Sequence, residues 1–231
     1  MSIPEISAWT GNIYLGEKVV AKGNCWHWII TKNTILFVPF TEDLTDHWPN
    51  EFALTNTWVQ LVQNQANVKV WYFNWSSYLS WANSNLFNFG DMHIWVWVKF
   101  NSFSWSQFRF SWIWSWDIFA WYQTRWSNWI WVGRNAVAWD TKYNIQLSSQ
   151  NWYYISIDRI SNSLNISVNA SSIWSGTNSN NYITTWWYQI GNDWTWNYVN
   201  WYISNLIIEN KWWSTDEETD YFNWNKWKYG L

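Results

Sequence analysis

The sequence predicts an all-β fold, an antiparallel two-sheet jelly-roll sandwich that ends in a short helix. Short apolar runs, rich in β-branched and aromatic residues, alternate with clusters of Asn, Ser and Thr. These runs cover residues 35–40, 92–100, 107–110, 152–158, 164–168 and 202–208. Many short strands at such spacing are typical of a sandwich or jelly roll, so we expect the two sheets to be built from these runs.

The helix signal is confined to the C-terminal end of the chain. Glu217 follows Ser214 by three residues, which is the spacing of a capping box with Ser214 as the N-cap. A helix is therefore expected over residues 215–226. We expect the chain to divide into an N-terminal β extension (1–34), one jelly roll (35–209) and a C-terminal cap helix with its tail (210–231).

Composition excludes several classes of protein. With 48% hydrophobic and 13% charged residues, and no apolar run near the ~18 residues of a membrane-spanning helix, neither disorder nor membrane insertion is expected. A net charge of −3, with scattered charges, gives no electrostatic basis for binding nucleic acid. Cys25 is the single cysteine, which excludes an internal disulfide and a Cys-clustered zinc site. Residues 1–11 show no signal-peptide pattern, so a virion or extracellular surface location requires another export route.

Tryptophan is unusually frequent. The 231 residues include 30 Trp and only 8 Gly, whereas Gly alone averages about 7% of a typical protein. Trp75, Trp194 and Trp201 each follow Asn or Asp, where Gly would favour a turn because it reaches positive φ without steric cost. We hypothesise that many Trp are UGA codons that mean glycine in a reassigned genetic code. These three residues are then expected to have positive φ or solvent-exposed rings.

Other tryptophans are expected to be authentic. Trp97, Trp139 and Trp152 lie in strand-like or core-like contexts that suit a bulky side chain. A Trp-rich sugar-binding or membrane-interface protein is the alternative explanation, since indole rings favour boundaries between water and apolar surroundings. The codons of the gene distinguish the two explanations, because UGG at the three turn positions excludes recoding.

An ordered set of motifs resembles one family. The set comprises residues 37–40 (FVPF), 72–79 (YFNWSSYL), 94–100 (IWVWVKF), 151–155 (NWYYI) and 200–208 (NWYISNLII). Together these motifs resemble laminin-G-like jelly rolls of the concanavalin A-like superfamily. The segments at both ends, residues 13–20 and 220–231, resemble parts of phage and prophage structural proteins. The resemblance implies a binding module on a virion or extracellular surface.

Catalysis is not expected. Glycoside hydrolases need two carboxylates that flank the scissile bond, and no Glu occurs between Glu51 and Glu209. The Asp residues within the sandwich are better explained as turn formers or surface charges (Asp91, Asp117, Asp140, Asp158 and Asp193). The three His have no metal-ligand spacing, and no Gly-x-Ser-x-Gly motif occurs. A glycoside hydrolase is therefore a remote alternative.

The candidate binding site lies in a polar and aromatic segment. Its members are Tyr122, Arg125, Arg134, Asn135, Trp139 and Asp140. Aromatic faces with planar hydrogen-bonding groups suit sugar recognition, although packing of Tyr122 and Trp139 and an ion pair of Arg134 explain the same residues without a ligand. A Ca²⁺ site at Asn192 and Asp193 is a weaker alternative, because a single carboxylate is a poor basis for binding calcium. No other cofactor is expected.

Two functions stay open at this point. The first is a non-catalytic, lectin-like module, such as a phage tail or head-decoration adhesin, that binds glycans. The second is a purely structural virion or assembly module that contacts other proteins and has no glycan ligand. An oligomer is compatible with both. An exposed aromatic and polar groove favours the lectin, whereas a contiguous apolar patch near the termini favours assembly.

Overall fold

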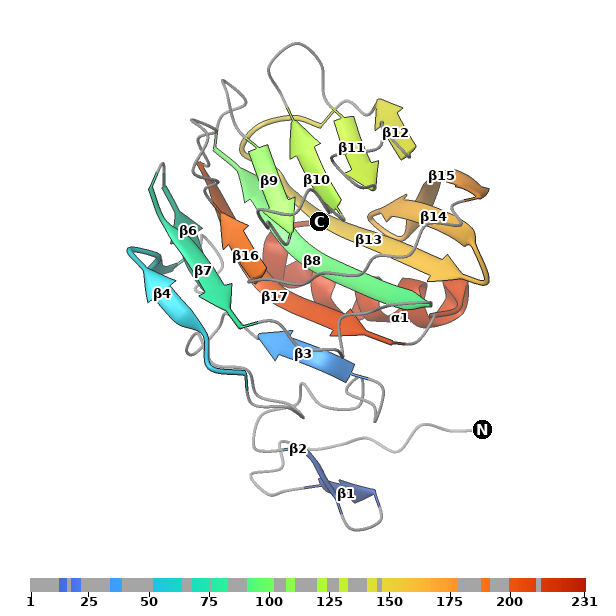
Figure 1. Ribbon diagram of the computed structural model, residues 1–231, viewed down its shortest axis with the longest axis horizontal. Helices are drawn as coiled ribbons and strands as arrows, with labels where there is room; N and C mark the ends of the chain where they lie inside the picture. The colour runs from blue at the N-terminus through green and yellow to red at the C-terminus, as the bar shows by residue number, and fades with distance from the viewer. Residues whose placement is uncertain are drawn as a thin grey trace.

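The computed structural model confirms the predicted architecture over the residues that it describes. These are residues 13–15, 18–21, 34–38, 52–63, 68–74, 76–82, 91–101, 107–110, 120–123, 129–132, 141–144, 147–177, 188–191, 200–210 and 213–231. Over these residues the protein is an antiparallel two-sheet jelly-roll sandwich with one C-terminal α-helix (Figure 1).

The larger sheet is eight-stranded. Its strands follow the order β15-β14-β13-β8-β17-β6-β5, and β3 also pairs with β17. Their bounds are β3 Thr34–Val38, β5 Gln60–Gln63, β6 Lys69–Phe73, β8 Met92–Phe100, β13 Trp152–Ile160, β14 Ser163–Val168, β15 Ser171–Thr177 and β17 Trp201–Glu209. The expected strands over 92–100, 152–158, 164–168 and 202–208 are all found in this sheet.

The second sheet is seven-stranded, and its strands follow the order β12-β11-β10-β9-β16-β7-β4. Their bounds are β4 Thr55–Thr57, β7 Tyr78–Trp81, β9 Gln107–Phe110, β10 Ala120–Gln123, β11 Trp129–Val132, β12 Thr141–Asn144 and β16 Tyr188–Gly191. Strands β1 (Ile13–Leu15) and β2 (Lys18–Ala21) form a separate hairpin, drawn below the sandwich in Figure 1.

The C-terminal helix begins where the capping box predicts. Helix α1 spans Thr215–Asn225 and continues as the 3-10 helix η2, Lys226–Tyr229. The Glu217 amide donates to Ser214 Oγ at 3.2 Å, and the Ser214 amide donates to Glu217 Oε2 at 2.8 Å, so both halves of the box form. No helix among the described residues is long and apolar enough to cross a membrane.

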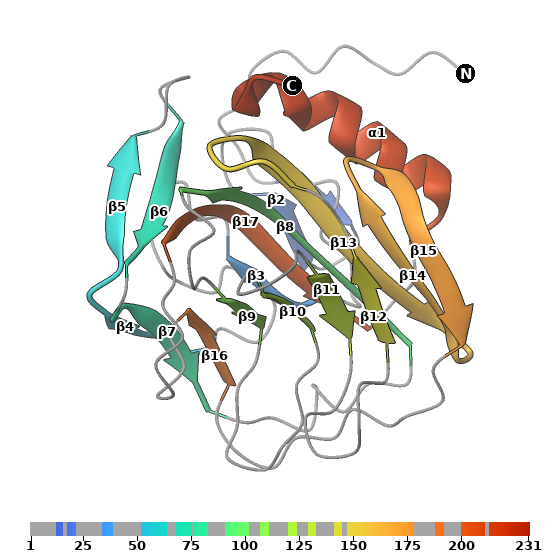
Figure 2. The ribbon, with the colours of Figure 1, turned by 90° about the horizontal axis from the view of Figure 1, so that it is seen from above.

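Strand β8 shows why the larger sheet is buried on both faces. Ile94 and Val96 face the smaller sheet and belong to the core between the two sheets. Trp95 and Trp97 point to the outer face, where they pack with Tyr221 of α1 and Tyr229 of η2. Figure 2 shows α1 lying over this face of the sheet. A strand that is covered on both faces has a continuous apolar run instead of a clean alternation, as β8 does.

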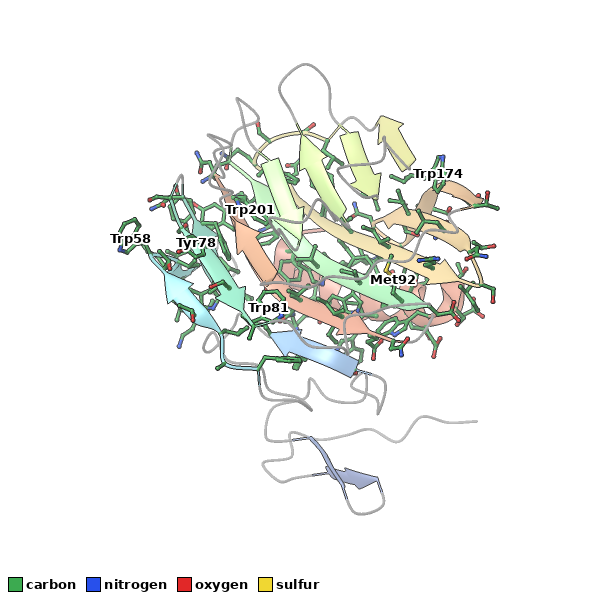
Figure 3. The ribbon with its side chains drawn as sticks, viewed as in Figure 1. Trp58, Tyr78, Trp81, Met92, Trp174 and Trp201 are labelled. Atoms are coloured by element: carbon green, nitrogen blue, oxygen red, sulfur yellow. The ribbon has the colours of Figure 1, made fainter. Side chains whose placement is uncertain are left out.

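The tryptophans give a mixed result for the recoding hypothesis. Trp201 lies in the extended strand β17 with its side chain fully buried beside Phe73 and Phe100, so the expectation of positive φ or an exposed ring is wrong there. Trp75 and Trp194 lie outside the described residues. Trp58 has a φ of 57° and is 70% exposed, which is the geometry that the hypothesis expects (Figure 3).

Candidate functional site

A row of aromatic and polar side chains crosses the outer face of the eight-stranded sheet. Residues that lie directly opposite one another on neighbouring strands point to the same face. Such pairs join Gln60 to Tyr72, Tyr72 to Tyr202, Tyr202 to Lys99 and Lys99 to Trp152, from edge strand β5 to β13. Trp152 is buried beneath η2, whereas Tyr72, Tyr202 and Lys99 are half-buried. We call these three half-buried residues the tyrosine platform.

The platform holds two tilted rings and one cation. The ring centroids of Tyr72 and Tyr202 are 5.0 Å apart, with 36° between the ring planes. Lys99 Nζ lies 5.7 Å from the centroid of the Tyr202 ring, which is within the range of a cation–π interaction. Burial, and next the neighbouring Tyr202, raise the pKa of the Tyr72 phenol, so this hydroxyl stays neutral and able to donate at ordinary pH.

Amide side chains adjoin the platform and form the amide cluster, Asn101, Gln150 and Asn200. Asn200 Oδ1 accepts a hydrogen bond from Tyr72 Oη at 3.2 Å and from Asn101 Nδ2 at 2.9 Å. Gln150 Nε2 donates to the Asn101 carbonyl oxygen at 2.8 Å. The chain of contacts fixes the Tyr72 hydroxyl and holds the cluster at the end of the sheet, where β8 ends and β17 begins.

This arrangement suits the binding of a polar ligand. The platform presents ring faces, a phenol hydroxyl and an ammonium group, and the cluster presents amides. None of these six residues carries a carboxylate, so the site lacks the pair that hydrolysis of a glycoside needs. Half-exposed rings beside planar hydrogen-bonding groups are the combination by which proteins hold polar ligands that have apolar faces, such as sugars.

The predicted site residues lie almost entirely outside the described residues. Tyr122 is in β10, where its backbone is opposite Phe108 of β9 and Ile130 of β11. The other predicted ligand-binding residues are outside the described residues (Arg125, Arg134, Asn135, Trp139 and Asp140), and so are the calcium candidates (Asn192 and Asp193). The structure therefore leaves these predictions as they were.

The sequence assigns Asp91 and Asp158 to turns or to the surface, and the structure agrees for Asp91 only. Asp91 fits the expectation, because its Oδ1 accepts a hydrogen bond from the amide of Ser161 in the β13–β14 turn at 2.7 Å. Asp158 does not, because it lies within β13, is buried, and contacts His93 Nδ1. Strand pairing with β8 sets its environment, and sequence reasoning about turn formers does not detect such pairing.

Sequence reasoning also missed the tyrosine platform. Tyr72 and Tyr202 each occur in a motif that predicts a strand, but they are far apart in the chain. The register between β6 and β17 brings them together, and no local pattern specifies that register. The signal available in the sequence is that each of two strand motifs carries a tyrosine next to buried positions, at Tyr72 and at Tyr202.

Comparisons with known proteins identify the fold and no family. No protein-family model and no curated protein matches the chain. The binding domain of botulinum neurotoxin DC, solved in complex with rat synaptotagmin II, superposes with a TM-score of 0.66 at 12% identity over 83% of this chain and 51% of that chain. The same domain in complex with SialylT gives 0.66 at 11% identity, over 83% and 51%. The binding domain of Paraclostridial Mosquitocidal Protein 1 gives 0.66 at 13% identity, over 83% and 52%.

These similarities show a shared β-rich fold. The chain covers about half the length of the solved chains it matches, 51% to 52% in these three structures. The structures are described as binding domains, not as catalytic domains, and one of them is described as a complex with SialylT. At this level of identity they say nothing about which residues of the present chain bind a ligand.

Proposed function

We propose that this chain is a non-catalytic carbohydrate-binding module and that its ligand lies on the tyrosine platform. The observation that carries the proposal is the paired, half-buried Tyr72 and Tyr202 beside Lys99, next to the cluster of three amides. The similarity to toxin binding domains, one of them solved with SialylT, supports the same class of function.

The platform fits a sugar in three ways. The rings of Tyr72 and Tyr202 offer apolar faces on which the C–H face of a sugar ring can pack. The Asn and Gln amides provide donors and acceptors in a plane, which matches ring hydroxyl groups. Lys99 adds a positive charge, so a glycan that carries a carboxylate or sulfate fits better than a neutral one.

The test is a glycan array followed by titration of the strongest hit. Tyr202→Ala is expected to weaken binding of that glycan by at least about fivefold, because it removes a stacking surface worth about 1 kcal/mol or more. Tyr78→Ala is the matched control, since Tyr78 is also a half-buried tyrosine but lies on β7 of the other sheet. Equal loss of binding in both variants, with both folded, would contradict the assignment of the site.

The C-terminal end of the structure favours a second candidate function, the assembly module. Trp224, Trp227 and Leu231 are exposed there, beside Lys226 and Lys228. Exposed apolar side chains near a terminus are suited to protein contacts. If no glycan on the array binds the wild-type protein, and Trp227→Ala abolishes a concentration-dependent oligomer in sedimentation velocity, the assembly role replaces the lectin role.

The proposed location is a virion or extracellular surface, because a glycan-binding module acts where glycans are displayed. The phage association rests on the resemblance of residues 13–20 and 220–231 alone. Antibody labelling of intact cells and of purified particles tests the location, and labelling that requires lysis would count against it.

We also propose that Trp58 occupies a position that is glycine in the natural chain. It lies in the turn between β4 and β5, where the Asn56 side chain bonds both the amide of Val59, at 2.9 Å, and its carbonyl oxygen, at 3.2 Å. The turn requires a φ of 57° at Trp58, a conformation that a bulky residue rarely adopts. The codon of the gene at position 58 decides: UGA supports the proposal and UGG excludes it.

A further inference from the structure

A second row of side chains crosses the same face of the sheet, under the start of helix α1. Strand pairing places Thr34, Glu209, His93, Asp158 and Asn165 in line across β3, β17, β8, β13 and β14. Glu209 and Asp158 therefore flank His93 on both sides. All three are buried, and this row shares no residue with the tyrosine platform.

The helix adds a third carboxylate to this row. Glu218 of α1 is buried against the sheet, and its Oε1 accepts a hydrogen bond from Ser156 Oγ of β13. Glu209 is held by Thr34 Oγ1, which donates to its Oε1 at 2.7 Å, and by Trp213 Nε1. The interface between helix and sheet thus contains the carboxylates of Asp158, Glu209 and Glu218.

Among the residues that the structure describes, His93 is a cation placed directly against Asp158. His93 Nδ1 contacts Asp158 Oδ1, and the His93 ring stacks on Trp213 with centroids 4.6 Å apart. Arg159 follows Asp158 on β13, so its side chain points to the opposite face of the sheet, and it donates to Asn162. When Asp158 and Glu218 are both ionised, a protonated His93 balances only one of these two buried charges, and the remaining negative charge is costly where water is excluded.

We propose that helix α1 is a pH-responsive latch, which protonation of Glu218 and His93 closes and deprotonation loosens. The titratable groups that face one another come from four elements: His93 from β8, Asp158 from β13, Glu209 from β17 and Glu218 from α1. Tyr154 and Tyr221, from β13 and α1, complete the buried surroundings. The proposal does not depend on the carbohydrate-binding function.

The electrostatics give the direction of the response. Burial raises the pKa of Glu218 from its ordinary value of 4.5, and the hydrogen bond from Ser156 offsets only part of the rise. Burial by itself lowers the pKa of His93, but Asp158 and the two glutamates outweigh burial and leave that pKa above its ordinary value of 6.5. Groups whose pKa is raised by folding stabilise the folded state below their ordinary pKa and lose that contribution as the pH rises through the raised value. The latch therefore tightens in acid and loosens as the pH rises above 4.5 for Glu218 and above 6.5 for His93.

Hydrogen exchange of the full chain, followed by mass spectrometry at pH 6 and pH 8, tests the latch. After correction for the intrinsic rate, the protection of the α1 amides is expected to be lower at pH 8 than at pH 6. The amides of β8 and β13 are expected to keep their protection. Glu218→Gln keeps the acceptor for Ser156 and removes the charge, so the fall should be smaller in this variant than in the wild type, and the remaining fall is that of His93.

Asp220→Asn is the matched control, because it removes the same charge from an exposed position of the same helix. It is expected to behave as the wild-type chain does. Equal protection of α1 at both pH values in the wild type would overturn the proposal, and so would a parallel loss of protection in α1 and β8. A pH-dependent fall in Glu218→Gln as large as that in Asp220→Asn would overturn it as well.

Discussion

Substitutions at Trp58 measure directly whether this position prefers glycine. Trp58→Ala and Trp58→Gly both remove an indole that is 70% exposed, so the small loss of contacts is the same in the two variants. They differ in the backbone, because alanine retains the cost of a φ of 57°, whereas glycine does not. That left-handed conformation costs an L-residue about 1–2 kcal/mol, and the greater entropy that glycine has in the unfolded chain returns about 0.5–1 kcal/mol. We therefore expect Trp58→Gly to be more stable than Trp58→Ala by about 0.5–1 kcal/mol.

Urea unfolding measures this difference. Where the variants unfold with the same slope m, a change in the urea midpoint reports a change in stability. The same pair of substitutions at Trp201 is the control, because Trp201 is buried in an extended strand. There the order should invert, with the alanine variant the more stable by about 0.5–1 kcal/mol. If Trp58→Ala equals or exceeds Trp58→Gly in stability, the glycine assignment at Trp58 is wrong.

Further substitutions test the core packing, the helix cap and a glycine of strand β16. Trp201→Ala should cost about 3–5 kcal/mol in urea unfolding, because the ring fills the core beside Phe73, and a cost below 1 kcal/mol would contradict that burial. Ser214→Ala should lower stability by about 1 kcal/mol and reduce helical ellipticity. Unchanged stability and ellipticity would show that the capping box does not stabilise α1. Gly191→Ala should cost about 1–3 kcal/mol, because φ is 112° and a Cβ would lie 2.5 Å from the Ser77 carbonyl oxygen, and a neutral result in thermal unfolding would refute that constraint.

Features that depend on local sequence were predicted well. The short apolar runs predicted β8, β13, β14 and β17, and the Ser214–Glu217 spacing predicted the start of α1. Trp201 was misassigned because a local turn signal, Asn followed by a residue read as glycine, was outweighed by pairing of β17 with β6 and β8. Tertiary context overrides local preference at such positions.

Features that depend on register were not predicted. Asp158 looks like an ordinary surface charge in the sequence, and only its position opposite His93 makes it part of a buried cluster. The tyrosine platform likewise exists because β6, β17 and β8 pair in one particular register. A shift by one residue would turn Tyr72 and Tyr202 toward the core, and a single sequence does not encode the register in any local pattern.

Chemical-shift mapping with the glycan that binds best locates the ligand on one sheet or the other. If the ligand lies on the tyrosine platform, the largest changes occur at Tyr72, Lys99 and Tyr202, followed by the amide cluster of Asn101, Gln150 and Asn200, and residues of β7 stay unchanged. Saturable changes confined to the seven-stranded sheet, or to the C-terminal surface around Trp227, would contradict it.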